Sequence, residues 1–136
     1  MREGLTGAEA SFLSGVRVAH LATLDSSGTP HVVPICPVLD LDRVVMASAY
    51  DRKIANIRGD SAVALCADEY SEDWDDGLRQ VIVEGDAYLI ESGPEFERDR
   101  ALLYEKFPQY ERVAPIEEGG AVIIEFRVAR VSSLGL

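Results

Sequence analysis

The sequence contains few residues of several kinds, and each shortage excludes a class of protein. Only two cysteines, Cys36 and Cys66, occur among its 136 residues. They lie far apart, and only two histidines could join them, so neither a disulfide framework nor a metal centre is expected. Each cysteine lies within an apolar stretch, and we expect both to be small buried side chains.

Apolar runs long enough for a secretory signal or a membrane span are missing as well. Low-complexity tracts and repeats of fixed period are also absent. With 47% hydrophobic and 27% charged residues, the composition is that of an ordinary globular protein. We therefore expect a cytoplasmic protein with a single domain, residues 1–136.

Positive charge is scarce throughout the sequence. Lysine and arginine number 13 against 24 aspartates and glutamates, which gives a formal net charge of −11. The only lysines are Lys53 and Lys106. Nucleic acid binding depends mostly on phosphate neutralisation by lysine and arginine, so this balance argues against it. It also disfavours binding to anionic membranes, and the expected partner is a small molecule or another protein.

The motifs of several common enzyme classes are absent too. We find no nucleophile elbow, no glycine-rich phosphate loop and no HExxH sequence. The stretch "DEYSEDWDD" (68–76) holds six carboxylates. Paired carboxylates can act as a general acid and a general base, but a solvated acidic loop is the favoured interpretation.

What the sequence does contain is a series of strands. Turn residues separate six stretches rich in β-branched and apolar residues. These expected strands cover residues 16–24, 31–39, 43–49, 62–70, 78–90 and 121–131. Without parallel crossover repeats, they predict a closed or nearly closed antiparallel barrel. Pro34 and Pro37 cannot donate to a ladder, so the second strand is expected at an edge, at a bulge or with a break in its pairing.

Two short helices are expected in the first half of the chain. Thr6 and Glu9 have the spacing of a capping box, which predicts a helix that ends at about Ser14. Asp51 can cap a second helix, which ends at Gly59.

A third helix is expected after Ser92, with Glu95 three residues further on. Its apolar side chains fall near one face, namely Phe96, Leu102, Leu103 and Phe107. The segment that follows, residues 108–120, is rich in proline and glycine and is expected to be a polar connection before the last strand.

The segment "SAYDRKIANIRGD" (48–60) gathers scarce cations at the start of the second helix. A helix N-terminus offers unpaired backbone N–H groups and the positive end of a dipole, which suit a phosphate. Ser48 can add a hydroxyl, and Arg52 and Lys53 can add charge-assisted hydrogen bonds. Spacing alone favours solvated side chains on a surface helix, with a phosphate site as the alternative.

Three segments together resemble the pyridoxamine 5′-phosphate oxidase-like, FMN-binding split-barrel family. They are "VAHLATLDSSGTPHVVPICPVLD", "SAYDRKIANIRGDSAVALCADEYSEDW" and "RQVIVEGDAYLI". They are most similar to the small branch that is often assigned to the deazaflavin coenzyme F-420. The likeness covers roughly residues 8–131, and its most specific parts are K-x-x-N-I-R from Lys53 to Arg58 and D-x-Y-x-x-D-W from Asp68 to Trp74.

The resemblance implies a mainly β fold, a six-stranded antiparallel split barrel with three short helices. It also implies a phosphate held near Ser48 and Lys53, a ring against the backbone of residues 33–36, and a loop contributed by a second subunit across a two-fold axis. The cofactor-binding residues implied in this way are Val33, Pro34, Ile35, Cys36, Ser48, Ala49, Arg52, Lys53, Asn56, Trp74, Arg79 and Gln80. Trp74 could equally be an anchor for its own loop.

The function implied by the resemblance is that of a homodimeric flavin-dependent oxidoreductase that transfers hydride to a small substrate. The alternatives are a flavin-binding carrier or sensor without turnover, and a structural barrel. FMN is expected to bind at least as tightly as deazaflavin F-420, because few cations are left for the anionic tail of the deazaflavin. Apolar residues on both faces of residues 81–90 and 121–126 also favour self-association.

Four further residues or motifs qualify this resemblance. Leu134 stands where many relatives carry tryptophan, and the C-terminal arginine motif of true pyridoxamine 5′-phosphate oxidases is missing, which argues against vitamin B6 oxidation. His31, next to a turn, is expected to be exposed rather than to polarise a bound ring. His20 is expected to be a core or interface residue.

Overall fold

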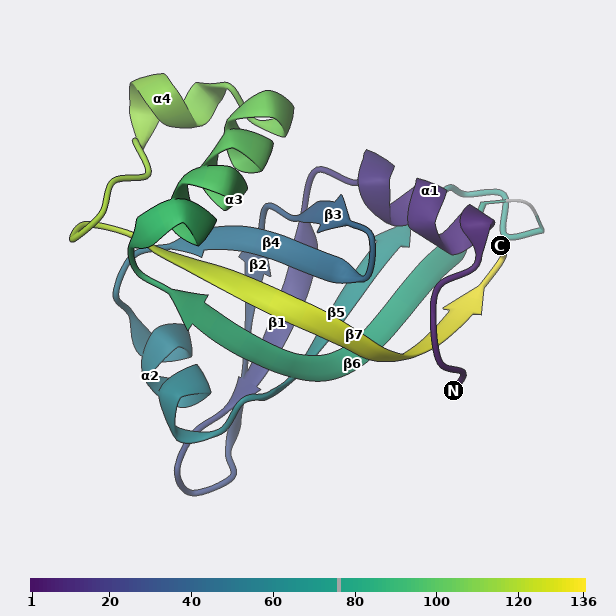
Figure 1. The fold of residues 1–136 in the computed structure, drawn as a ribbon. Helices are drawn as coiled ribbons and strands as arrows, with labels where there is room; N and C mark the ends of the chain where they lie inside the picture. Colours follow the sequence, from purple (N-terminus) through teal and green to yellow (C-terminus); the bar gives the residue numbers. More distant parts are fainter. Residues whose placement is uncertain (76) are drawn as a thin grey trace.

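The structure, a computed structural model, describes residues 1–75 and 77–136 (Figure 1). The described residues form seven strands and four helices. In chain order these are α1 (Gly7–Gly15), β1 (Ala19–Leu24), β2 (Pro30–Ile35), β3 (Val38–Asp40), β4 (Arg43–Ser48), α2 (Arg52–Gly59), β5 (Ala62–Glu69), β6 (Arg79–Ile90), α3 (Gly93–Lys106), α4 (Gln109–Val113) and β7 (Val122–Leu134).

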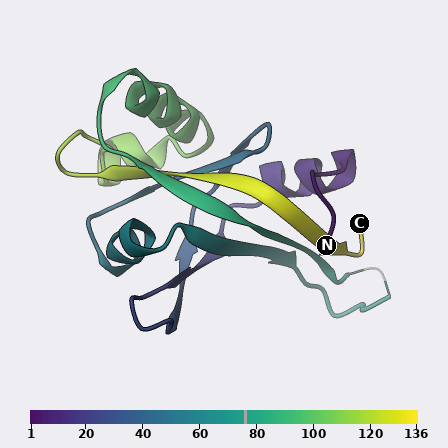
Figure 2. The same cartoon turned by 60° about the horizontal axis from the view of Figure 1, so that its bottom comes forward.

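The strands form one antiparallel sheet in the order β2-β1-β5-β6-β7-β4-β3. The sheet curls on itself, as Figures 1 and 2 show from two directions. The predicted mainly β split barrel is thus confirmed, although it contains seven strands where six were expected. No helix among the described residues is both long and apolar enough to cross a membrane.

The seventh strand arises from a break at Cys36 and Pro37. The expected strand over 31–39 divides there into β2 and β3, which lie at the two ends of the sheet order. Pro37 has no N–H to donate, so pairing cannot continue through it. The prediction that these prolines mark an edge or a break is confirmed, and the barrel is split between β2 and β3.

The two longest strands, β6 and β7, lie side by side in the middle of the sheet order. Their register shifts at a bulge between Glu84 and Gly85. A Cβ atom at Gly85 would lie 1.8 Å from the carbonyl oxygen of Arg127, so only glycine fits where the strands approach closely. β7 also continues to Leu134, beyond the predicted end at residue 131.

The helices begin near the predicted residues, but of the three predicted side-chain caps only that of α1 forms. The amide of Glu9 donates to Oγ1 of Thr6 (3.2 Å) and the amide of Thr6 donates to Oε1 of Glu9 (2.9 Å), which confirms the capping box of α1. Ser92 precedes α3 without a side-chain capping bond. The prediction of a connection over 108–120 was wrong at its start, because α4 forms there.

Two hydrophobic clusters stabilise the fold. One fills the inside of the curled sheet and includes Met46 and Phe126. The other lies between the outer face of the sheet and α3, and it includes Val45, Phe96 and Ile123. β4 and β7 are therefore buried on both faces within a single chain. We expected a second subunit to cover the outer face of residues 121–126, but helix α3 of the same chain covers it.

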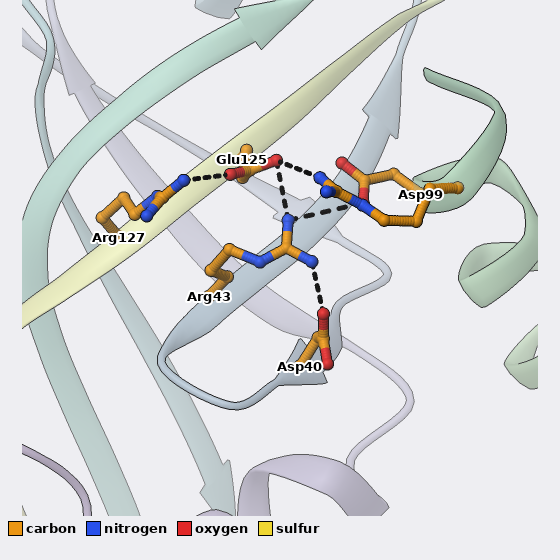
Figure 3. A network of polar contacts seen from close by, with 6 residues as sticks. Asp40, Arg43, Asp99, Glu125 and Arg127 are labelled. Atoms are coloured by element: carbon orange, nitrogen blue, oxygen red, sulfur yellow. Dashed lines mark hydrogen bonds and ion pairs between the residues drawn. The ribbon is translucent and has the colours of Figure 1, made fainter. Parts of the chain in front are cut away.

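A network of buried charges also fastens α3 to the sheet (Figure 3). Arg43 on β4 pairs with Glu125 on β7 (2.7 Å), with Asp99 on α3 (3.4 Å) and with Asp40. Arg127 pairs with Glu125 from the other side (2.8 Å). Burial raises the pKa of Asp99, whereas hydrogen bonds from Asp99 and Arg127 lower the pKa of Glu125 despite its burial. Of these two carboxyl groups, Asp99 is the one that retains a proton more readily.

Candidate functional site

The candidate site begins where β4 ends and α2 starts. Ser48 is buried, and its hydroxyl donates to the carbonyl of Ala49 (2.7 Å). Asp51 occupies the N-cap position of α2, as predicted, but its side chain accepts no hydrogen bond from a backbone amide of the helix. Its two carboxylate oxygens each lie 3.4 Å from Oγ of Ser48. The Asp51 side chain thus turns toward β4 rather than toward the first amides of α2.

Lys53 points at the same carboxylate. Its Nζ donates to Oδ2 of Asp51 at 2.5 Å, and only 12% of its side chain is exposed. Lys53 is therefore not a solvated surface side chain. Ser48 and Lys53, two of the residues predicted to bind phosphate, already surround one anionic group. The carboxylate of Asp51 acts as a stand-in anion for Lys53, whereas the single O–H of Ser48 is donated to the carbonyl of Ala49.

The other two cations of α2 are also paired with carboxylates. Arg52 is about half exposed, and its Nη2 lies 3.8 Å from Oδ2 of Asp25 in the turn between β1 and β2. Arg58 bonds to Glu91 at 2.8 Å, away from the helix start. Hydrogen bonds from Ser27 and Thr29 lower the pKa of Asp25. Arg52 can thus reach the candidate site only by leaving Asp25.

Asn56 is one turn further along α2 and is buried. Its Nδ2 donates to Oγ1 of Thr23 on β1 at 3.0 Å. This bond crosses between two elements far apart in the sequence and fixes the position of α2 on the sheet. Asn56 therefore holds the helix that carries Lys53.

The segment predicted to contact the ring lies on the edge strand β2. Val33 packs against the core inside the barrel and Ile35 is buried there, while Pro34 is exposed. In the described sheet β2 pairs with β1 only, so its other edge has no strand partner. Backbone groups along that edge are available to a ligand. Cys36 follows at the break and is half-buried rather than fully buried as expected; Cys66 is half-buried too, and both are free thiols.

Two cavities with shared lining residues lie beside the end of β4 and beside the break after β2. The first, of about 210 Å³, is lined by Ser48 and Ala49 and closed by Tyr110 and Ala114. The second, of about 380 Å³, shares Tyr110 and Ala114 and reaches Cys36, with apolar walls that include Phe107 and Val113. The short helix α4 therefore lies against both cavities, one beside Ser48 and Ala49 and one beside Cys36.

Two polar groups near the break after β2, Tyr110 and Lys106, have shifted pKa values. Burial, together with the nearby thiol of Cys36, raises the pKa of Tyr110 to about 12. Burial and the charge of Arg17 lower the pKa of Lys106 to about 8, and its Nζ donates to the carbonyl of Pro37 at 2.7 Å. This bond holds the end of α3 against the break that separates β2 from β3.

The remaining predicted residues lie at the other end of the sheet. Figures 1 and 2 both place the loop between β5 and β6 opposite to α2. Trp74 is 68% exposed in this loop, and its Nε1 donates to the hydroxyl of Tyr70 (2.7 Å). Arg79 and Gln80 begin β6 beside it, and Arg79 pairs with Glu69 (2.8 Å). Within one chain these residues do not meet Lys53.

Other predicted features have mixed outcomes. His20 is exposed on the outer face of β1, opposite Pro34 and Cys66. His31 is half-buried rather than exposed, and its buried Nδ1 has no hydrogen-bond partner among the described residues. Asp76, the last residue of the acidic stretch, lies outside the described residues. The parts of the chain that are described contain no group of histidines, cysteines and carboxylates able to hold a metal ion.

Two residues of the candidate site, Asp51 in its observed contacts and Tyr110, were not predicted from the sequence. The contacts of Asp51 with Ser48 and Lys53 were not predicted, because an aspartate at this position was expected to cap the helix. Tyr110 was missed because prolines flank its helix and indicated a connection. The T-shaped packing of Tyr110 on Phe107, with ring centroids 6.1 Å apart, is the contact that places it over the cavities.

The model of the pyridoxamine 5′-phosphate oxidase family matches residues 5–135. The match spans nearly the whole barrel described above, and the chain therefore belongs to this family. No curated protein sequence matches the chain.

Several solved structures share the fold. An FAD-binding protein from Mesorhizobium loti is 21% identical with a TM-score of 0.78, over 95% of this chain and 94% of that one. A heme storage protein from Vibrio cholerae is 15% identical with a TM-score of 0.77, over 98% and 94% of the two chains. An F-420 reductase is 22% identical with a TM-score of 0.69, over 94% and 98%. At these identities the likeness establishes the fold alone.

Proposed function

We propose that the protein is a flavin-dependent oxidoreductase that binds FMN or deazaflavin F-420 through its phosphate and transfers hydride to a small substrate. The observation that carries this proposal is the largely buried ammonium group of Lys53, which contacts an anionic group at the start of α2, with Oγ of Ser48 3.4 Å from the same carboxylate. A hydroxyl, an ammonium group and a helix N-terminus are the donors that suit a phosphate. The family supplies the class of cofactor.

In this proposal the phosphate takes the place of the Asp51 carboxylate. Lys53 then pairs with the phosphate, and Asp51, which is about half exposed, turns outward. Arg52 leaves Asp25, from which it is separated by 3.8 Å, and adds a second cation. The ring lies along the free edge of β2, where the backbone of residues 33–36 meets it.

The bound cofactor supplies hydride transfer, and the protein supplies position and polarity. Tyr110 and Phe107 form apolar walls of the cavity that reaches Cys36, and we place the substrate there. These side chains exclude water from one side of the ring and select a substrate with an apolar body. An acid–base pair is not required of the protein for this step.

A second copy of the chain is proposed to complete the site. The outer face of β2, β1, β5 and β6 presents adjoining apolar side chains, which include Val32, Ala22, Ala64 and Ile82. Helix α3 covers β4 and β7 instead, so this face is the part of the sheet left for a partner. A two-fold contact here would bring the loop with Trp74 of the partner subunit toward the start of α2.

The alternative is a flavin-binding carrier or sensor without turnover. Two measurements on the purified protein separate the possibilities. Flavin or deazaflavin absorbance supports either reading, whereas a Soret band would indicate heme and contradict both. Reduction of the bound cofactor by a chemical donor, followed by reoxidation with an added substrate, supports the oxidoreductase. A cofactor that is bound but never reoxidised by any substrate supports the carrier.

A further inference from the structure

Three cations without a carboxylate partner lie on the segments around one cavity. Among the described residues, Arg17, Lys106 and Arg112 are the lysines and arginines that form no ion pair, although the chain has a net charge of −11. Arg17 lines the cavity of about 380 Å³ beside the break after β2. Lys106 ends α3 at that break, and Arg112 is exposed on α4, which also lines the cavity. In so acidic a protein, unpaired cations gathered in one place give a local attraction for anions.

Arg17 and Lys106 both contact the buried ring of Phe107. The guanidinium carbon of Arg17 lies 4.5 Å from the centre of this ring, and Nζ of Lys106 lies 5.2 Å from it. Nη1 of Arg17 donates to the carbonyl of Lys106 (3.2 Å), and Nζ of Lys106 donates to the carbonyl of Pro37 (2.7 Å). These bonds to neutral carbonyls hold both cations in place but leave their charges uncompensated.

The carboxylates nearest in the fold do not compensate these charges. Burial and the charge of Arg17 lower the pKa of Lys106 to about 8, which is the opposite of the effect of a paired carboxylate. Arg17 also lines a neighbouring groove with Asp68 and Glu69, but it forms an ion pair with neither, and Glu69 bonds to Arg79 (2.8 Å). An anion bound beside Arg17 and Lys106 would therefore relieve a repulsion that no described side chain relieves.

The cavity itself suits an apolar body. Arg17 is the one charged side chain among its described lining residues, and Val18, Phe107 and Val113 are apolar walls. Its volume lies within the usual range for small-molecule sites. No serine or threonine among the described residues lines it, so it lacks the hydroxyl donors that often hold a phosphate. A guanidinium fork matches a carboxylate, which it can bind through two parallel hydrogen bonds.

Building on the proposed function, we infer that the substrate is an apolar carboxylate, whose anionic group pairs with Arg17 and Lys106 and whose body lies in the cavity against Phe107. The cavity reaches Cys36, the last residue of the segment assigned to the cofactor ring. The body of the substrate therefore extends from the two cations toward the ring. Arg17 is the residue that selects an anionic substrate over a neutral one of the same shape.

The test uses three probes with the same ring system: 2-naphthoate, the neutral 2-naphthamide and 2-naphthyl phosphate. Titration calorimetry measures their dissociation constants for the wild type, Arg17→Gln, Arg17→Lys, Lys106→Met and the control Arg58→Gln. Arg58 lies on α2, pairs with Glu91 (2.8 Å) and does not line the cavity, so the control removes a cation elsewhere. FMN is titrated into the wild type in parallel, as an independent test of the proposed function.

We expect the wild type to bind 2-naphthoate at least about tenfold more tightly than 2-naphthamide, as follows from hydrogen bonds to a charged group. Arg17→Gln should remove most of this preference and Lys106→Met part of it. Arg17→Lys, which keeps the charge, should retain much of it, and Arg58→Gln should leave it unchanged.

Equal affinities of the wild type for 2-naphthoate and 2-naphthamide, or binding of neither, would overturn the inference. An equal loss of both probes in Arg17→Gln would show that Arg17 only supports the cavity wall, and would overturn it too. Tighter binding of 2-naphthyl phosphate than of 2-naphthoate would overturn the choice of a carboxylate. Failure of FMN to bind, with the preference for 2-naphthoate intact, would instead overturn the proposed function and leave the carboxylate site in place.

Discussion

At the scale of single residues, the candidate site depends on side chains that are close in sequence. Ser48, Asp51 and Lys53 lie within six consecutive residues, so the sequence could predict that they are close together. It could not predict how they pair, because an aspartate at an N-cap usually accepts from its own helix. The structure shows the competing arrangement, in which the carboxylate accepts from Lys53. Asn56 differs again, since its partner Thr23 lies on a distant strand that no local pattern identifies.

Lys53→Ala should weaken binding of a phosphorylated flavin by about 1.5–3 kcal/mol, the range for hydrogen bonds to charged groups. The free protein should lose no more than about 1 kcal/mol, because the partner Asp51 is about half exposed. Titration calorimetry measures the affinity and thermal unfolding the stability. Arg58→Ala is the matched control, since Arg58 is on the same helix but bonds to Glu91. An unchanged affinity in Lys53→Ala would contradict the assignment.

Glu9 gives a pH-dependent prediction. Burial alone would raise its pKa, but hydrogen bonds from Ser133, Thr6 and Arg2 outweigh burial and lower the pKa from 4.5 to about 2. A depressed pKa stabilises the fold above the unfolded value, and this stabilisation is lost as the pH falls from about 4.5 through about 2.

Glu9→Gln should therefore reduce the free energy of unfolding by about 3 kcal/mol at pH 7, as a shift of this size implies. Denaturant unfolding at a series of pH values should show the gap between the wild type and the variant narrowing from about pH 4.5 and closing near pH 2. Glu3 is an exposed residue of the N-terminal segment, and the control Glu3→Gln should have the same free energy of unfolding as the wild type. A gap between wild type and Glu9→Gln that stays constant down to pH 2 would refute the role of this carboxylate.

At the scale of elements, strand periodicity and turn residues predicted most of the sheet. The two prolines also predicted the break in residues 31–39, because the missing N–H of proline acts locally. Helix α4 was missed since its stability comes from packing, through Tyr110 and Phe107, rather than from local propensity. The burial of β7 on both faces was interpreted as a subunit contact, whereas α3 provides that cover. The residue pattern of one strand shows that both of its faces are apolar, but it does not show which element packs on each face.

The docking of α3 depends on the charge network around Arg43. Glu125→Gln removes the carboxylate that pairs with both Arg43 and Arg127, and it should destabilise the protein by about 3–5 kcal/mol, as is typical when one partner of a buried pair is removed. Asp99→Asn should cost less, because burial raises the pKa of Asp99 and the neutral amide resembles its protonated form. Chemical denaturation of both variants measures this order. Equal losses, or a larger loss for Asp99→Asn, would show that Asp99 is ionised in the folded protein.

At the scale of the whole molecule, the ordered set of segments predicted the split barrel that the family match then confirmed. The arrangement of the site was harder to predict from the sequence, because the loop with Trp74 and the start of α2 lie at opposite ends of the sheet (Figures 1 and 2). β6 alone spans about 35–40 Å between them, from the rise of a strand over its length. A site that joins Trp74 to Lys53 therefore requires a second subunit.

The protein is accordingly predicted to be an obligate two-fold dimer. An interface of this kind should bury roughly 2,000 Å² or more. Light scattering at micromolar concentration should give the mass of two chains, twice 14.9 kDa. Ile82→Glu places a charge on the outer face of β6 and should weaken association, whereas Leu41→Glu, on an exposed side chain in the turn between β3 and β4, serves as the control. A wild-type mass equal to one chain would contradict the dimer.

The central claim is that this chain binds a flavin through its phosphate, and the single tryptophan, Trp74, allows a direct measurement. Its fluorescence can be followed while the protein is titrated with a phosphorylated flavin and, separately, with riboflavin. The account predicts saturable quenching with one ligand per chain, and an affinity at least about tenfold higher with the phosphate, since charge-assisted hydrogen bonds contribute more than 1.4 kcal/mol. Quenching that never saturates, or equal affinities for the two ligands, would contradict it.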